Sequence, residues 1–197
     1  MTELVLIGHR ATRTARVLWM LEELGQPFTY REARPHSEDV EKKNPSGKVP
    51  VLLVEGETLT DSTAIMSFLT DRAGRFTRPC GSIERARQDG LTHLVLDEFD
   101  AVLWVAGRHS YVLPEELRVA GVKDAAKWEF ERNQKRLAER LGDGPFLMGE
   151  DMTVPDIILA HCLGWAVKAE FTPLAPELAA FLERMRARPA YARAMAH

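Results

Sequence analysis

The segment PSGKVPVLLVEGETLTDSTAI, residues 45–65, decides the fold. A Val-Pro step opens an apolar run at residues 51–54, an EGE turn follows, and a second short run covers residues 58–60. Two such runs joined by a Gly-containing turn are typical of a β-hairpin. The hairpin ends at an Asp-Ser pair, where the apolar spacing of residues 61–72 becomes that of a helix. The segment therefore predicts a strand-strand-helix unit that opens with a proline.

The residues before this segment add a strand-helix-strand unit. Residues 4–7 read as a buried strand, and residues 12–24 carry apolar side chains at helical spacing until Gly25 stops the helix. A second strand at residues 27–33 and a short polar helix at residues 37–43 follow. A strand-helix-strand unit normally gives a parallel pair of strands, and a tight turn gives an antiparallel pair. The order βαβ-αββα therefore predicts a mixed four-stranded sheet with helices packed on it.

The second half of the chain is almost entirely helical. GRFTRPCGS, residues 74–82, interrupts the periodicity with two Gly and a Pro, which makes it the best linker candidate. The helix expected from residue 153 is apolar nearly all round, as is typical of a helix at the centre of a bundle. We therefore predict an α/β N-terminal domain, a linker and an all-α C-terminal domain, at residues 1–76, 77–85 and 86–197.

Composition excludes several classes of protein. The 197 residues are 45% hydrophobic and 28% charged, which is ordinary for a soluble globular protein. A net charge of −3 offers no general attraction to nucleic acid. No apolar run is long enough for a signal peptide or a membrane span, so we expect a cytoplasmic protein without a membrane partner. Cys80 and Cys162 belong to no paired motif and are expected to be reduced thiols.

Together these features resemble the cytosolic glutathione transferase family, and the resemblance covers nearly the whole chain. It rests on the βαβ-αββα order, the NPSGKVPVL turn, the Asp-Ser pair, the linker near residue 80 and the helical second half. RVLWMLEELGQPF, residues 16–28, resembles the first helix and second strand of bacterial members. FLMGEDMTVPDIILAHCLGWA, residues 146–166, resembles the family's buried sixth helix, with Thr153 and Asp156 spaced as a capping box. The resemblance implies a thioredoxin-like glutathione-binding domain, a helical domain and a homodimer.

The resemblance also implies a set of glutathione-binding residues. In the family the Val49-Pro50 bond is cis, and the Val49 backbone pairs with the tripeptide; the alternative is a trans proline that starts an edge strand. Asp61 and Ser62, at a helix N-terminus, are expected to meet the carboxylate and ammonium of the γ-glutamyl end. The family usually has Glu where this chain has Asp61, and either residue is also a favoured helix cap. Lys48 is expected to meet the glycine carboxylate of glutathione or its backbone on the thiol side. The alternative is a solvated loop lysine.

The catalytic position departs from the family pattern. The thiol-activating residue is commonly Tyr, Ser or Cys near the first helix, and GHRATRTARVLW, residues 8–19, contains none of these. Bacterial relatives that read Ser-Arg-Ser before such a helix place their first Ser at Thr12. A hydrogen bond from the Thr12 hydroxyl to a thiolate contributes ~1.5–3 kcal/mol, or about one to two pKa units. Thr12 is therefore the candidate catalytic residue, and the helix N-terminus with Arg10 or Arg13 is expected to assist it. The alternative is that Thr12 only caps the helix and that Arg13 or Thr14 holds the catalytic role.

Two further groups of residues complete the expected site. The apolar stripe of residues 91–103 predicts a long helix, and the family forms its electrophile pocket toward the end of that helix. Core packing explains the tryptophan there equally well. These pocket candidates are Trp104, Arg108, His109 and Tyr111. His93, Asp97 and Asp100 lie near one helix face, but no Cys or His partner has matching spacing, so we predict no metal. Asp97 or Asp100 is expected to reach glutathione across the dimer interface.

The sequence thus predicts a glutathione transferase with glutathione as co-substrate. The bound thiolate is expected to attack a small hydrophobic electrophile or a peroxide. One alternative is a glutathione-dependent reductase or isomerase, for which a Cys at the catalytic position would be favourable evidence. The other alternative is a non-catalytic glutathione-binding or assembly module on the same fold.

Overall fold

The computed structural model describes residues 3–142 and 144–197, which divide into two compact units. The first unit comprises Met1–Cys80 and Arg186–His197, and the second comprises Gly81–Met185. Over the described residues, none of the helices combines the length and the apolar character that crossing a membrane requires.

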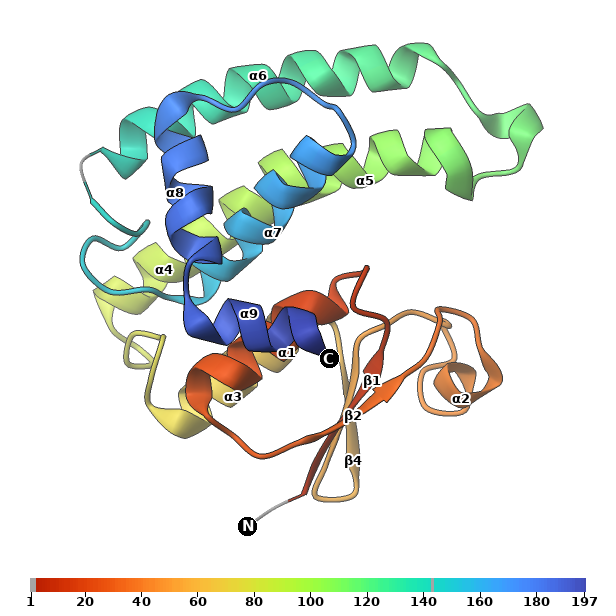
Figure 1. Ribbon diagram of the computed structural model, residues 1–197, viewed down its shortest axis with the longest axis vertical. Coiled ribbons are helices and arrows are strands. Elements are labelled where there is room, and N and C mark those ends of the chain that lie inside the picture. The colour runs from red at the N-terminus through yellow and green to blue at the C-terminus, as the bar shows by residue number, and fades with distance from the viewer. Residues whose placement is uncertain (1–2, 143) are drawn as a thin grey trace. The chain divides into compact units, whose positions relative to one another are not determined.

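A mixed four-stranded sheet forms the centre of the first unit, as the sequence predicts (Figure 1). The strand order is β2-β1-β3-β4, with β1 parallel to β2 and antiparallel to β3, and with β3 antiparallel to β4. The strands are β1 (Leu4–Gly8), β2 (Thr29–Glu32), β3 (Val51–Val54) and β4 (Glu57–Thr60). All five residues of β1 are buried, so both faces of this strand are covered. Burial on both faces explains why the strand is a continuous apolar run in the sequence.

The described part of the first unit, from residue 3 onward, contains the helices α1 (Thr14–Leu24), α2 (Glu38–Glu41), α3 (Ser62–Ala73) and α9 (Pro189–Ala196). Gly25 ends α1 with φ 65°, a left-handed conformation that favours glycine, so the predicted stop is confirmed. Val40 of α2 packs with Val5, Ile7 and Val51 on one face of the sheet. In Figure 1, α1 and α3 lie together with α9 beside the sheet, and α1 contacts both of the other helices.

The structure differs from the expected domain boundaries at the C-terminal end of the chain. Residues 86–197 were expected to form the helical domain, but α9 packs on α1 in the first unit. Arg188 donates two hydrogen bonds to the Glu23 carboxylate at 2.5 and 2.8 Å, and the Trp19 and Tyr191 rings meet edge to face at 4.8 Å. An ion pair with two parallel N–H donors and an aromatic contact therefore fix α9 to α1.

Over the described residues of the second unit, the named elements are all helices, and loops connect them. Residues 83–112 are continuously helical and contain two π-helical segments. The regular apolar spacing of the sequence did not predict these segments. α7 contacts α4, α5 and η1, and ten of its residues are buried, which confirms the central helix. The elements are α4 (Ile83–Val95), η1 (Leu96–Ala101), α5 (Val102–Gly107), η2 (Arg108–Val112), η3 (Glu115–Leu117), α6 (Gly121–Leu141), α7 (Val154–Lys168) and α8 (Pro176–Arg186).

The start of α7 is held by a buried carboxylate, as the predicted capping box requires. Asp156 Oδ2 accepts hydrogen bonds from the Thr153 N–H at 2.8 Å and the Thr153 hydroxyl at 3.1 Å. Asp156 Oδ1 accepts from the Leu147 N–H at 2.8 Å, which ties the preceding loop to the helix. Burial raises the pKa of Asp156 to about 6, although these hydrogen bonds oppose the shift. The capping box therefore organises both the loop and the first turn of α7.

Candidate active site

The sheet topology gathers three segments of the candidate site at one edge. β4 runs in the same direction as β1 because each is antiparallel to β3. The register places Ile7 opposite Val51, and Val51 opposite Thr60. Three segments therefore meet at the edge of the sheet where β1 and β4 end and β3 begins. They are the loop after β1, the Val-Pro step before β3 and the start of α3. α1 and α3 both begin there, and a helix N-terminus carries a partial positive charge that favours anions.

Gly8 allows these segments to approach one another closely. A Cβ atom at this position would lie 2.2 Å from Thr14 Oγ1 and 3.1 Å from Val49 Cβ, so no larger residue fits without movement. The Tyr30 hydroxyl donates to the Gly8 carbonyl oxygen at 2.9 Å. Burial, with a smaller contribution from the charge of Glu32, raises the pKa of Tyr30, which keeps this donor protonated. The end of β1 is thus fixed between α1 and the Val49 loop.

Thr12 is half-buried in the loop that leads into α1. Its hydroxyl donates to the His9 carbonyl oxygen at 2.6 Å, lies 3.0 Å from Thr14 Oγ1 and accepts from the Thr14 N–H at 3.2 Å. The hydroxyl has one proton, so donation to a bound thiolate requires that proton to leave the His9 carbonyl. Thr14 is fully buried and lies against Thr12, where it can position the hydroxyl.

The two arginines near Thr12 occupy different environments. The Arg10 guanidinium donates from Nη1 to the carbonyl oxygens of Met195 and His197, at 2.9 and 3.2 Å. Arg10 is therefore held at the end of α9, an attachment that its neighbourhood in the sequence did not predict. Arg13 is half-buried at the residue that precedes α1.

The Val49-Pro50 peptide bond is cis, as the resemblance predicts. Pro50 is buried and Val49 is half-buried beside Gly8. Across the described ranges, no hydrogen bond between backbone groups uses the Val49 N–H or carbonyl. Both groups are the type that an added extended peptide can pair with.

Lys48 lies exposed in the preceding loop. The Asn44 side-chain amide donates to the Lys48 carbonyl at 2.8 Å, which fixes the backbone of the loop. The salt bridges formed by the described part of the chain do not include the Lys48 ammonium. The geometry is compatible both with a carboxylate ligand and with a solvated side chain.

Asp61 and Ser62 form the start of α3, and the structure gives them different environments. Asp61 is the N-cap of α3, and its Oδ1 accepts from the N–H groups of Thr63 and Ala64 at 2.9 and 3.0 Å. The capping alternative is therefore confirmed for Asp61, whose φ of 70° and ψ of 123° are rare for a residue other than glycine. Ser62 is only 2% exposed at the first position of α3.

The pocket candidates lie on α5 and on η2, which follows it directly in the second unit. Trp104 is half-buried, and Arg108 is exposed one helical turn later. His109 instead anchors the segment that follows η2, because its Nδ1 accepts from the Val119 N–H at 3.2 Å. Asp97 is exposed on η1, whereas Asp100 is buried within the unit. This burial favours Asp97 over Asp100 for the role expected of one of them across a subunit interface, which stays a prediction.

Tyr111 lies near a tryptophan that the sequence did not identify as part of the site. A Cβ atom at Gly107 would lie 3.0 Å from the Tyr111 hydroxyl and 3.5 Å from the Trp165 ring. Tyr111 is 63% exposed, and Trp165 is half-buried on α7. The uniformly apolar pattern of α7 concealed Trp165, because it distinguishes no face of that helix.

Comparison with known proteins connects both units to one family. The family model of the glutathione S-transferase N-terminal domain matches residues 13–72, and that of the C-terminal domain matches residues 99–189. Glutathione S-transferase GstA of Escherichia coli O157:H7 is 29% identical over 180 residues, 86% of each chain. Maleylacetoacetate isomerase of Rhizobium meliloti is 28% identical over 145 residues, which cover 67% of this chain and 66% of the isomerase. The structure of a sphingomonad glutathione S-transferase in complex with glutathione is 25% identical, with a TM-score of 0.81 over 98% of this chain and 97% of that one.

Proposed function

This chain belongs to the glutathione S-transferase family, and we propose that it binds glutathione at the sheet edge described above and activates its thiol. The observation that carries the proposal is the convergence of the Thr12 loop, the Val49 backbone and the start of α3 at that edge. The two helix N-termini favour a thiolate near α1 and a carboxylate near α3.

We assign the glutathione-binding roles as follows. The cysteinyl backbone of glutathione pairs with the N–H and carbonyl of Val49, next to Pro50. The Ser62 hydroxyl donates to the γ-glutamyl carboxylate, and Asp61 uses its remaining carboxylate oxygen for the ammonium while Oδ1 caps α3. Lys48 meets the glycine carboxylate from the exposed loop.

The proposed reaction begins with loss of the thiol proton to solvent. The Thr12 hydroxyl then donates to the thiolate, which stabilises it at neutral pH. The sulfur forms a bond to an electrophilic carbon, and the leaving group departs with its electron pair. We assign contacts with a small hydrophobic electrophile to Trp104, Arg108 and Tyr111, and we infer from the family that the protein acts as a homodimer.

The similarity to maleylacetoacetate isomerase supports a second candidate function. Reversible addition of a glutathione thiolate to a conjugated double bond allows rotation about that bond before the thiolate is expelled. This reaction needs the same activated thiol but consumes no glutathione. It therefore predicts isomerisation of a cis-enedione or maleyl compound with a constant concentration of glutathione.

The proposed function is tested by measuring turnover and glutathione binding on the same preparation. We expect retention on immobilised glutathione together with conjugation of 1-chloro-2,4-dinitrobenzene or glutathione-dependent reduction of cumene hydroperoxide. Isomerisation without glutathione consumption would select the second candidate. Retention without turnover of any of these substrates would indicate a binding module, and the absence of both retention and turnover would contradict the proposal.

Replacement of Ser62 by alanine is expected to weaken glutathione binding at least about tenfold, because it removes a donor to a charged carboxylate. The helix start should survive, since Asp61 supplies the cap of α3. Ser67→Ala, on the same helix, is the matched control and should leave the affinity unchanged. Isothermal titration calorimetry with both variants provides the measurement, and wild-type affinity in Ser62→Ala would exclude the assigned glutamyl site.

A further inference from the structure

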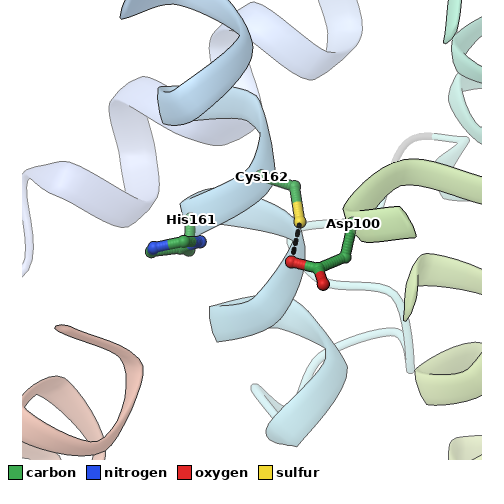
Figure 2. A group of neighbouring side chains, drawn as sticks. All are labelled: Asp100, His161 and Cys162. Atoms are coloured by element: carbon green, nitrogen blue, oxygen red, sulfur yellow. Dashed lines mark hydrogen bonds between the residues drawn. The ribbon is translucent and has the colours of Figure 1, made fainter. Parts of the chain in front are cut away.

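Three potential metal ligands from two elements meet inside the second unit (Figure 2). Asp100 belongs to η1, whereas His161 and Cys162 are neighbours on α7. One ligand atom from each side chain lies within 4.8 Å of the other two. Asp100 and Cys162 are buried and His161 is half-buried.

The direct contact in this cluster joins Cys162 Sγ to Asp100 Oδ1 at 3.8 Å. Without a bound cation, the Cys162 thiol can donate a hydrogen bond to the Asp100 carboxylate. Asp100 occupies a π-helical segment, a geometry that is rare in proteins and frequent at functional sites. The contact spans 62 positions of the sequence, so no local spacing motif announces it.

We propose that Asp100, His161 and Cys162 form a binding site for a divalent cation of the zinc type. A thiolate, an imidazole and a carboxylate are the donors that Zn²⁺ accepts, and three protein ligands plus one water complete a four-coordinate site. Tetrahedral bonds of ~2.0–2.3 Å place neighbouring donor atoms roughly 3.3–3.8 Å apart. For one sulfur and one oxygen ligand the expected separation is about 3.5–3.7 Å, and the observed sulfur–oxygen separation of 3.8 Å is close to it.

The remaining separations require only side-chain adjustment. The upper bound of 4.8 Å has to shorten by about 1 Å, a change within the reach of rotation about the side-chain bonds of His161. His161 is the half-exposed member, so it borders the position that a water ligand would occupy. The binding step replaces the proton of Cys162 with the cation and releases that proton to solvent.

Charge balance favours occupancy of the site by a dication. The Cys162 thiolate and the Asp100 carboxylate supply two negative charges, which offset the two positive charges of the ion. The coordinated ion would connect η1 to α7 in the second unit, in addition to their existing packing. None of the three residues is assigned to glutathione or the electrophile, so the inference is independent of the proposed function.

Cobalt binding to the full-length chain tests this inference. We expect wild-type protein to take up one Co²⁺ with a thiolate-to-cobalt charge-transfer band, and Zn²⁺ to displace the cobalt. Cys80→Ser removes the exposed cysteine and is the matched control, which should retain the band. Cys162→Ser should abolish the band, and His161→Gln and Asp100→Asn should each weaken uptake at least about tenfold.

His161→Gln keeps the test decisive if a buried substitution prevents folding, because its side chain is half-exposed; circular dichroism checks each variant. X-ray absorption of the wild-type cobalt complex should also report one sulfur ligand. Absence of the charge-transfer band in wild-type protein would overturn the site. A band that disappears in Cys80→Ser or persists in Cys162→Ser would also overturn it, as would unchanged uptake in His161→Gln.

Discussion

Replacement of Asp156 by alanine is expected to lower the free energy of unfolding by about 3–5 kcal/mol near neutral pH. The substitution leaves the buried N–H groups of Leu147 and Thr153 without their acceptor, and each orphaned group costs ~1–3 kcal/mol. Loss of the capping box weakens the first turn of α7 further. Urea unfolding monitored by circular dichroism measures the effect.

An exposed acidic residue close by provides the control. Glu150→Ala lies in the loop before α7 and should change the free energy of unfolding by less than about 0.5 kcal/mol. A change below about 1 kcal/mol in Asp156→Ala would contradict the structural role of the carboxylate.

The same variant reports the pKa of Asp156. Burial raises this pKa from 3.8 to about 6 in the folded protein, so the folded state binds a proton that the unfolded state has lost between these pH values. The stability contributed by protonation is fully present below pH 3.8 and is lost as pH rises through about 6. The difference in unfolding free energy between wild type and Asp156→Ala should therefore grow as pH falls from 7 to 4, by up to about 3 kcal/mol. A pH-independent difference would show that the pKa is not raised.

Removal of the Thr12 hydroxyl by Thr12→Val is expected to lower kcat/KM by about tenfold to a hundredfold near neutral pH. Loss of a hydrogen bond to the thiolate raises the pKa of bound glutathione by about one to two units, so less thiolate is present. The deficit should shrink as pH rises past the new pKa, where the thiolate forms without that donor. Thr12→Ser keeps the hydroxyl and should retain most of the activity. The pH dependence of kcat/KM, with thiolate absorbance in the glutathione complex, measures the effect.

The structure makes it possible to separate catalysis from the hydrogen bond that Thr12 makes at the start of α1, whose N-cap is Arg13. Thr12→Val also removes the acceptor for the Thr14 N–H, and this loss lowers stability by about 1 kcal/mol without moving a pKa. Thermal unfolding detects the capping effect, whereas the pH profile detects the thiolate effect. An unshifted profile with lowered stability would leave Thr12 with only a structural role at the start of α1. It would transfer the donor role to Arg13, Thr14 or backbone N–H groups there.

Local signals in the sequence were sufficient to predict the sheet and several helix boundaries. The hairpin, the stop at Gly25 and the capping box at Thr153 each depend on residues a few positions apart, and the structure confirms all three. Backbone conformation and capping are decided by near neighbours, which explains why one sequence is enough to read them. The family resemblance also predicted the cis bond at Pro50.

Only the tertiary structure decided the contacts between distant parts of the chain. α9 reads as one more helix of the C-terminal half, yet its Arg188 pairs with Glu23 in the first unit. The sequence predicted no metal because Asp100 has no partner nearby in the chain, and the packing of η1 on α7 then brings Cys162 to it. The apolar period of a helix specifies which face is buried but not which other helix will cover it, so partners separated by many residues become visible only when the helices pack.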